Sequence, residues 1–484
     1  MTHTPLPGSH ITTMHAGALS RAIHARQVSC REVMQAYLQR IGALNPRFNA
    51  IVSLQDGDAL LAQADGRDAQ LARGASMGWM HGMPQAIKDM ANVAGIPTTM
   101  GSPLLRDFVP LHDGLMVQRM KSAGCIVIGK TNTPEFALGS HTFNLVFGLT
   151  RNAYDPRRSA GGSSGGAAVA LATQMLPVAD GSDFMGSLRN PAGWNNLFGF
   201  RPSQGRVPAW PAPDAFLSQL GTEGPMGRSV LDVALLLDTQ AGFDPRAPLS
   251  ISERTDFTHG LGGLDCARLR LGWLGNLSGY LAIEPGILEV CEQALARLAG
   301  LGCRVEETAL GFAPELVWRA WLDWRAALIA PRVAPFLLQP QQREQVKPEA
   351  QWEHEQSQHL SGNALMAASV QRSAFYRHLL GLFEAHDFLA LPSAQVWPFD
   401  AGLRWPAQIN GVAMDSYHRW MEVTIYATFA GLPCISIPAG FDARGLPMGL
   451  QIIGRPRADL EVLRLAHAYE QCAADLLQRG PPGV

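Results

Sequence analysis

The stretch Ala160-Gly161-Gly162-Ser163-Ser164-Gly165-Gly166 places four glycines around two adjacent serines. Glycine adopts backbone conformations that other residues avoid, and it lets another part of the chain approach closely. The same composition is also typical of a flexible linker. Residues 167–176, however, are rich in alanine and leucine and favour a helix. We therefore predict a loop that opens onto a helix N-terminus inside a packed domain.

A second small-residue segment, Gly181-Ser182-Asp183-Phe184-Met185-Gly186-Ser187, ends 24 positions after Ser163. Successive backbone N–H groups in such a turn can converge on one point and stabilise the negative charge that develops when a carbonyl is attacked. Taken alone, the segment fits an ordinary turn between a strand and a helix equally well. Beside the first segment, it favours an oxyanion-binding site next to a reactive serine.

Lys88 follows the run Met83-Pro84-Gln85-Ala86-Ile87, which predicts a buried strand edge. Burial disfavours the ammonium form, lowers the pKa of a lysine and allows the neutral amine to take a proton from a serine hydroxyl. The alternative is that Lys88 forms an ion pair with Asp89 or another carboxylate. The three segments together describe a serine made nucleophilic without histidine, which is the chemistry of an amide hydrolase.

These segments resemble the amidase signature family, whose Ser-cisSer-Lys triad matches Ser187, Ser163 and Lys88. The resemblance implies that Ser187 attacks the carbonyl carbon. It also implies that Ser163 follows a cis peptide bond and relays the proton, and that Lys88 receives it.

The resemblance extends to the residues around the triad. It implies an oxyanion hole made by the backbone N–H groups of Phe184, Met185 and Gly186. It also implies that three further residues support the site without taking part in the chemistry, namely Asp183, Arg189 and Ser164. The family commonly has small residues where Phe184 and Met185 stand, so we expect these side chains to narrow or reshape the pocket.

The similarity covers most of the chain, with a gap at about residues 305–425. It includes residues 19–52, 199–208, 224–229, 430–433 and 445–454. It implies an α/β fold in which a large mixed β-sheet is covered on both faces by α-helices. It also implies a single domain over residues 1–484, with three parts: an N-terminal helical segment (about 1–75), a signature core (about 76–210) and a variable helical, Trp-rich segment (about 310–425).

Local patterns predict several elements of that fold. Ser29-Cys30-Arg31-Glu32 is a capping box that predicts the start of a helix. Apolar runs predict buried strands at residues 125–128, 269–274 and 303–305, and helical spacing predicts helices at residues 115–123 and 285–298. Strands that alternate with helices indicate a layered α/β architecture with a largely buried sheet.

The variable segment contains Trp318, Trp321 and Trp324 at intervals of three. Aromatic residues at helical spacing usually lie in the core, but these tryptophans are also candidates for an apolar substrate channel. The sequence from His354 to His359 is one residue too long for the H-E-x-x-H zinc helix, so it predicts a solvated helix face and no metal.

Composition excludes several classes of partner. The chain has 39 basic and 41 acidic residues and no polybasic stripe, so no nucleic-acid partner is predicted. Residues 1–10 lack the apolar core of a signal peptide, and no apolar run approaches the roughly 20 residues that a membrane span needs. Seven scattered cysteines without a C-x-x-C pair fit reduced thiols in a cytoplasm. We predict a monomer or homodimer without a cofactor that binds a small-molecule amide or carbamate.

The resemblance leaves the substrate open. Abundant Trp and Met, together with Phe184 and Met185, favour a bulky apolar or aryl amide or carbamate (urethane). One alternative is the glutamine amidotransferase subunit of a tRNA-dependent complex, and another is a non-catalytic binding protein on the same scaffold. A fourth possibility is that Ser164 serves as the nucleophile of a G-x-S-x-G elbow, but residues 154–159 are polar, contain proline and do not favour the strand that this elbow requires.

Overall fold

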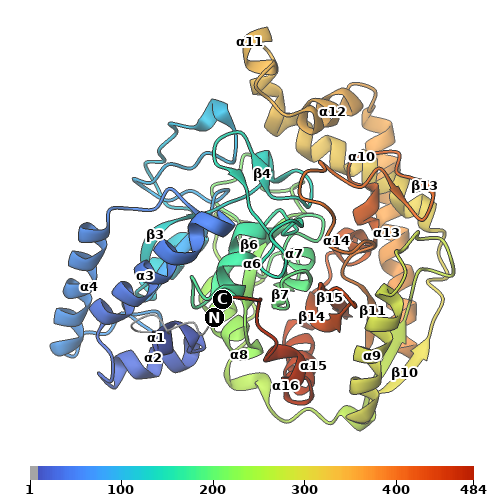
Figure 1. The fold of residues 1–484 in the computed structure, drawn as a ribbon. Coiled ribbons are helices and arrows are strands. Elements are labelled where there is room, and N and C mark those ends of the chain that lie inside the picture. The colour runs from blue at the N-terminus through green and yellow to red at the C-terminus, as the bar shows by residue number, and fades with distance from the viewer. Residues whose placement is uncertain (1–8) are drawn as a thin grey trace.

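The computed structural model describes residues 9–484, and its framework is an eight-stranded mixed β-sheet (Figure 1). The strand order is β10-β9-β11-β15-β14-β7-β8-β6. The strands are β6 (Ala179–Asp183), β7 (Phe198–Arg201), β8 (Thr222–Gly227), β9 (Arg270–Trp273), β10 (Arg304–Glu307), β11 (Phe388–Pro392), β14 (Cys434–Phe441) and β15 (Pro447–Gly454). β9 runs parallel to β10 and β11, and the other neighbours are antiparallel, which confirms the predicted mixed sheet.

A three-stranded sheet adjoins the edge of the large one. It has the order β1 (Ile51–Val52), β3 (Ile126–Thr131) and β2 (Pro84–Lys88), with β2 parallel to β3. Lys88 ends β2, and its backbone N–H donates to the Asp180 carboxylate in β6 at 3.1 Å. Two short ribbons complete the strands: β4 (Phe143–Asn144) with β5 (Gly148–Leu149), and β12 (Gln408–Ile409) with β13 (Val412–Ala413).

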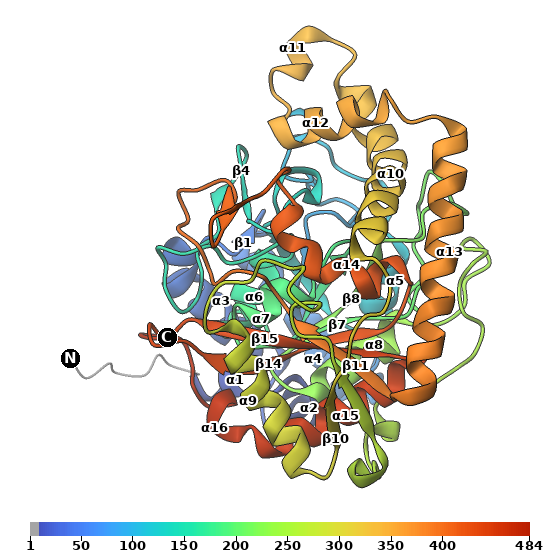
Figure 2. The same cartoon turned by 90° about the vertical axis from the view of Figure 1, so that its right-hand side faces the viewer.

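Helices cover both faces of the large sheet, as predicted. Figure 2 shows α6 and α7 above the strands and α9 and α15 below them. The α-helices are α1 (Ser9–Thr13), α2 (Ala16–His24), α3 (Cys30–Phe48), α4 (Gly57–Ala72), α5 (Leu115–Ser122), α6 (Gly165–Ala172), α7 (Arg189–Gly193), α8 (Val230–Gln240), α9 (Ile287–Gly300), α10 (Pro314–Val333), α11 (Pro340–Arg343), α12 (Pro348–Ser357), α13 (Gly362–Ala385), α14 (Ile425–Phe429), α15 (Asp459–Cys472) and α16 (Ala474–Leu477). Short 3-10 helices span Pro103–Leu105, Glu135–Ala137, His259–Leu261, Cys266–Arg268, Ala334–Phe336 and Arg419–Thr424.

The predicted element boundaries agree with the structure where local signals are strong. At the start of α3, Ser29 Oγ accepts from the Glu32 N–H, and the Glu32 carboxylate accepts from the Ser29 N–H, which confirms the capping box. The strand predicted at 125–128 continues as far as Thr131 in β3. Hydrophobicity did not predict this extension, because it contains Lys130, whose ammonium is buried and bonded to the Ala91 carbonyl and the Thr98 hydroxyl. The division into one domain stays a prediction, and residues 1–8 of the predicted polar terminus lie outside the described residues.

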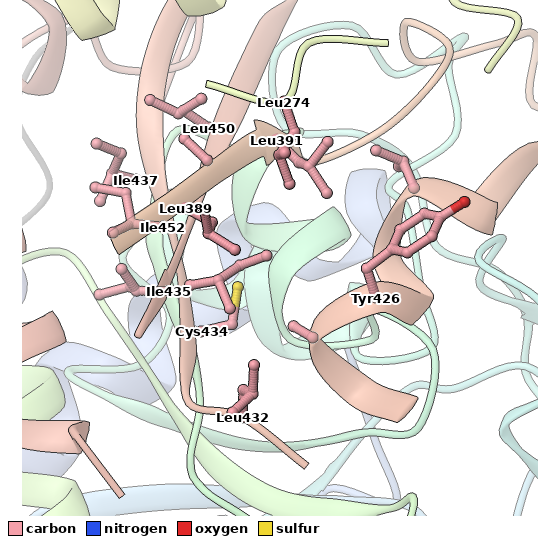
Figure 3. Close-up of a cluster of buried hydrophobic side chains, with 14 of the residues drawn as sticks. Leu274, Leu389, Leu391, Tyr426, Leu432, Cys434, Ile435, Ile437, Leu450 and Ile452 are labelled. Carbon is pink, nitrogen blue, oxygen red and sulfur yellow. The ribbon is translucent and has the colours of Figure 1, made fainter. Parts of the chain in front are cut away.

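The central strands are buried on both faces (Figure 3). Ile435 and Ile437 of β14 are cross-strand partners of Ile452 and Leu450 of β15, so these four side chains share one face. In β11 the partner of Leu391 is Gln451, which places Leu391 on the opposite face. Strands packed on both faces read as nearly continuous hydrophobic runs, as these strands do.

Candidate active site

Three serine hydroxyls surround the ammonium group of Lys88. Lys88 Nζ lies 2.8 Å from Ser163 Oγ, 2.8 Å from Ser164 Oγ and 2.9 Å from Ser182 Oγ. The side chain of Lys88 is buried, and within the described residues it forms no ion pair. The alternative pairing with Asp89 is wrong, because the Asp89 carboxylate accepts from Thr99 and lies beside Lys130 instead.

Burial changes the protonation of Lys88. Removal from water lowers the pKa of Lys88 from 10.5 to about 7, although the nearby carboxylates of Asp180, Asp183 and Glu223 partly oppose this effect. A substantial fraction of Lys88 is therefore neutral near pH 7, and a neutral amine can accept a proton from a hydroxyl.

The loop that carries Ser163 is held by side chains of the preceding segment. The Gly162–Ser163 peptide bond is cis, as the resemblance implies. Ser140 donates to the Gly162 carbonyl at 2.6 Å, and Thr142 donates to the Gly161 carbonyl at 2.8 Å. At Gly166, a Cβ atom would lie 2.3 Å from the backbone nitrogen of Asn132, so the second pair of glycines serves close packing of α6.

The turn that carries Ser187 is organised by the Asp183 carboxylate. Asp183 accepts the N–H of Gly186 at 2.8 Å and the N–H of Leu188 at 3.2 Å, and it forms a buried ion pair with Arg189 at 2.9 Å. The guanidinium groups of Arg189 and Arg201 keep the pKa of Asp183 below its usual range despite burial. The predicted supporting position of Asp183 and Arg189 thus corresponds to contacts that shape this turn.

One predicted oxyanion donor is not free. Gly186 has a φ of 82°, and its N–H points to Asp183, so the prediction for Gly186 is corrected. The backbone N–H groups of Phe184, Met185 and Ser187 have no hydrogen-bond acceptor within residues 9–484, and all three residues line the pocket described next. The N–H of Ser187 is therefore a candidate donor that sequence reasoning missed.

A pocket of about 780 Å³ opens onto these groups. Ser163, Ser182 and Ser187 line its base. Its walls are largely apolar and include Met90, Met100, Leu105, Phe108, Phe136, Phe184, Met185, Ile329 and Phe336. Phe184 and Met185 thus contribute to the pocket as expected. The volume and the lining suit an apolar small-molecule ligand.

The three tryptophans of α10 are corrected as channel candidates. Trp318, Trp321 and Trp324 are at most 7% exposed and belong to the hydrophobic core rather than to the pocket wall. Trp321 packs edge-on against the ring of Phe184 at 5.6 Å, so it supports the pocket from behind.

Charged pocket residues that were not anticipated include Arg325 and Glu223. Arg325 of α10 donates to Glu353 and to the Tyr417 hydroxyl, both at 2.6 Å, and its guanidinium group lies 5.4 Å from the centre of the Phe184 ring. Glu223 of β8 also lines the pocket. Gly224-Pro225 follows Glu223 within β8, and nothing local predicts which strand Glu223 pairs with.

Two other interpretations of the sequence concern the surroundings of Ser164 and α12. Among the described residues, no strand leads directly into Ser164, since residues 151–159 form only isolated bridges, so the elbow that requires a strand is excluded. Ser164 Oγ is instead bonded to Lys88.

Most of the segment from His354 to His359 is solvent-accessible at the end of α12. In the described part of the chain, no three His, Cys, Asp or Glu side chains are arranged to hold a metal ion. No helix of residues 9–484 is long and apolar enough to cross a bilayer.

The fold and the grouping of Lys88 with the serines define an α/β protein of the amidase class. The amidase family model matches residues 32–463, and the chain belongs to this family, whose members hydrolyse C–N bonds. The chain is 34% identical to one subunit of the glutamyl-tRNA(Gln) amidotransferase of Thermus thermophilus, over 96% of this chain and 99% of the relative.

Two further relatives are named as acylamidases. The chain is 32% identical to an acylamidase of Rhodococcus erythropolis, over 94% of this chain and 95% of that protein. The crystal structure of a bacterial aryl acylamidase of the amidase signature family superposes with a TM-score of 0.89 at 30% identity, covering 96% of this chain and 97% of that one. The expected membership of the amidase signature family and its fold are confirmed.

Proposed function

We propose that this protein is a serine hydrolase that cleaves the C–N bond of bulky apolar or aryl amides through an acyl-enzyme on Ser187. The observation that carries the proposal is the buried Lys88, bonded to Ser163 at the base of a large apolar pocket that Ser187 also lines. In this proposal Ser187 is the nucleophile, Ser163 relays the proton and Lys88 is the base.

The steps follow from the positions of these groups. Ser187 Oγ attacks the substrate carbonyl carbon while its proton passes to Ser163 and the Ser163 proton passes to neutral Lys88. The resulting oxyanion is stabilised by the N–H groups of Phe184, Met185 and Ser187. The C–N bond then breaks as the ammonium group of Lys88 returns a proton through Ser163 to the leaving amine. Water then attacks the carbonyl carbon of the acyl-enzyme while its proton passes through Ser163 to Lys88. The acid is released as the proton returns to Ser187 Oγ.

Carbamates fit the same scheme. Attack on a urethane would leave a carbonate-type ester on Ser187, and hydrolysis would finish as amine, alcohol and carbon dioxide. The apolar walls of the pocket support aryl or bulky alkyl substituents on either side of the scissile bond.

A second candidate is a glutamine amidotransferase subunit, which is what the relative from Thermus thermophilus is named for. Glutamine carries a carboxylate, and a buried carboxylate needs a cationic partner. In this pocket Arg325 donates to Glu353 and Tyr417 while its Nη1 lies beside the Met185 sulfur, and Arg332 donates to Ser218. These contacts favour a neutral apolar substrate over glutamine.

The test is a panel of nitroanilides, aryl carbamates, acetamide and glutamine incubated with the purified protein, with release of amine or ammonia as the measurement. We expect aryl substrates to turn over faster than both acetamide and glutamine. Glutaminase activity that appears only with partner subunits would instead support the amidotransferase. Ligand binding without turnover of any substrate would support a non-catalytic binding protein.

The pH dependence tests Lys88 as the base. Because Lys88 is active when neutral and burial lowers its pKa to about 7, we expect kcat/KM to be low at acidic pH, to rise through pH 7 and to level off at mildly alkaline pH. The measurement is kcat/KM from about pH 6 to about pH 9 in a buffer series of constant ionic strength. A flat profile, with acylation shown to limit the rate, would contradict a lysine base.

A further inference from the structure

Glu223 is a carboxylate in the pocket that the proposed reaction leaves without a role. Its side chain is half-buried and lines the pocket beside Ser163, Ser182 and Ser187. Within the described residues, its carboxylate forms no hydrogen bond and no ion pair. A half-buried charge without a partner is costly, so this position calls for an explanation.

The pairing of β6 with β8 places Glu223 close to Lys88. In this antiparallel pair Ser182 is the direct partner of Glu223, so their side chains project from the same face, with Cβ atoms about 5 Å apart. Ser182 Oγ in turn accepts a hydrogen bond from Lys88 Nζ at 2.9 Å. The side chain of Ser182 therefore links the position of Glu223 to the ammonium group of Lys88.

The other charged groups near Lys88 have partners of their own. Asp180 of β6 accepts the backbone N–H of Lys88, and Asp183 is neutralised by Arg189 and Arg201. On the next strand, Lys130 lies beside Asp89. Glu223 is therefore the unpartnered charge in this group, and it faces the pocket from which the substrate arrives.

We propose that the Glu223 carboxylate is a positioning residue that stabilises the ammonium form of Lys88 and so decides at which pH Lys88 becomes a base. This inference rests on the proposed function. When Ser187 attacks, the proton that reaches Lys88 creates a positive charge, and the negative charge of Glu223 stabilises that state.

The titration of Glu223 itself is consistent with this position. Burial, with a contribution from Asp180, raises the pKa of Glu223 from 4.5 to about 7, while Lys88 opposes the rise. Two interacting groups that titrate in the same range lose their protons in two steps that belong to the pair. The acidic limb of the rate profile should therefore be spread over more than about two pH units, which is broader than a single titration gives.

Glu223→Gln removes the charge and keeps the shape of the side chain. We expect the acidic limb to move to lower pH by about 0.5 to 1.5 units and to sharpen to a single titration, because the ammonium form of Lys88 loses its stabilising charge. We also expect the alkaline plateau to fall about threefold, because a base of lower pKa is a weaker base.

The readout is the rate at which an aryl sulfonyl fluoride inactivates the protein, measured from about pH 5 to about pH 9, with the adduct located on Ser187 by mass spectrometry. Glu223→Asp keeps the charge and should return the acidic limb of the pH–rate profile toward that of the parent protein. Glu289→Gln removes an exposed carboxylate on α9 and should leave the limb unchanged.

The outcomes separate the two proposals. A parent protein that reacts at Ser187 while Glu223→Gln keeps the parent's limb and plateau would overturn the role of Glu223 and leave the proposed function intact. A limb that moves equally in Glu289→Gln would also overturn it, since net charge would then be the cause. A parent protein that does not react at Ser187 at any pH would overturn the proposed function and, with it, this inference.

Discussion

Ser187→Ala is expected to lower kcat by at least about 10⁴-fold, because it removes the group that forms the covalent intermediate. Ser187 is nearly buried at the base of the pocket, so alanine fits its place without disturbing the turn. The measurement is amine release from the best substrate of the panel, together with the loss of the covalent adduct by mass spectrometry.

Ser164→Ala is the matched control for this substitution. Ser164 lies beside Ser163, and its hydroxyl accepts one of the hydrogen bonds of Lys88, so its loss should cost on the order of tenfold and should leave the adduct on Ser187. Residual activity of Ser187→Ala comparable to that of Ser164→Ala would show that Ser187 is not the nucleophile. Loss of the adduct in Ser164→Ala alone would move that role to Ser164.

Arg189→Leu is expected to have the largest effect on stability. Its guanidinium group is fully buried and donates to Asp183, to the Thr424 carbonyl at 2.9 Å and to the Thr428 hydroxyl at 2.8 Å. Leucine would leave the Asp183 carboxylate with Arg201 at 3.5 Å as its cationic partner and would remove these hydrogen bonds, and breaking a buried ion pair costs about 3–5 kcal/mol. We expect the apparent free energy of unfolding in urea to fall by about that amount, and kcat to fall with it because Asp183 holds the Ser187 turn.

Arg157→Leu provides the comparison. Arg157 also pairs with an aspartate, Asp155, at 2.9 Å, but its side chain is 84% exposed. Exposed ion pairs contribute little because water and salt screen them. If the two variants lose the same stability, or if Arg189→Leu folds with unchanged stability and activity, the buried pair does not organise the turn as described.

Local sequence signals predicted the parts of the fold that neighbours along the chain control. The capping box at Ser29, the helix after the glycine loop and the buried strand that ends at Lys88 all appear in the structure. The grouping of Lys88 with Ser163 also agrees with the resemblance, since both lie in short motifs that are recognisable by residue type and spacing. The roles assigned to these residues stay part of the proposed function.

The predictions were wrong at residues whose contacts depend on side chains or helices from other parts of the fold. Gly186 was expected to offer its N–H to the substrate, but the carboxylate of Asp183 takes it, and this depends on how Arg189 orients that carboxylate. The tryptophans of α10 were candidates for the pocket wall, yet the packing of α10 against its neighbours turns them into the core. In both cases the residue types indicated a site or a core, but the sequence did not indicate where the Gly186 N–H group or the tryptophan side chains point.

Residue types and their spacing along the chain predict a lysine at the end of an apolar strand, serines in two glycine-containing turns, and a helix that begins at the Ser29 capping box. Which of these groups lie in contact depends on the packing of the whole fold. Ser182 and Glu223 are 41 positions apart and become neighbours through the register of β6 and β8. Arg325 reaches the Phe184 ring only because α10 packs over the turn. The physical reason is that strand register and helix packing follow from the burial of the whole core, whereas caps, turns and strand ends follow from interactions over a few residues.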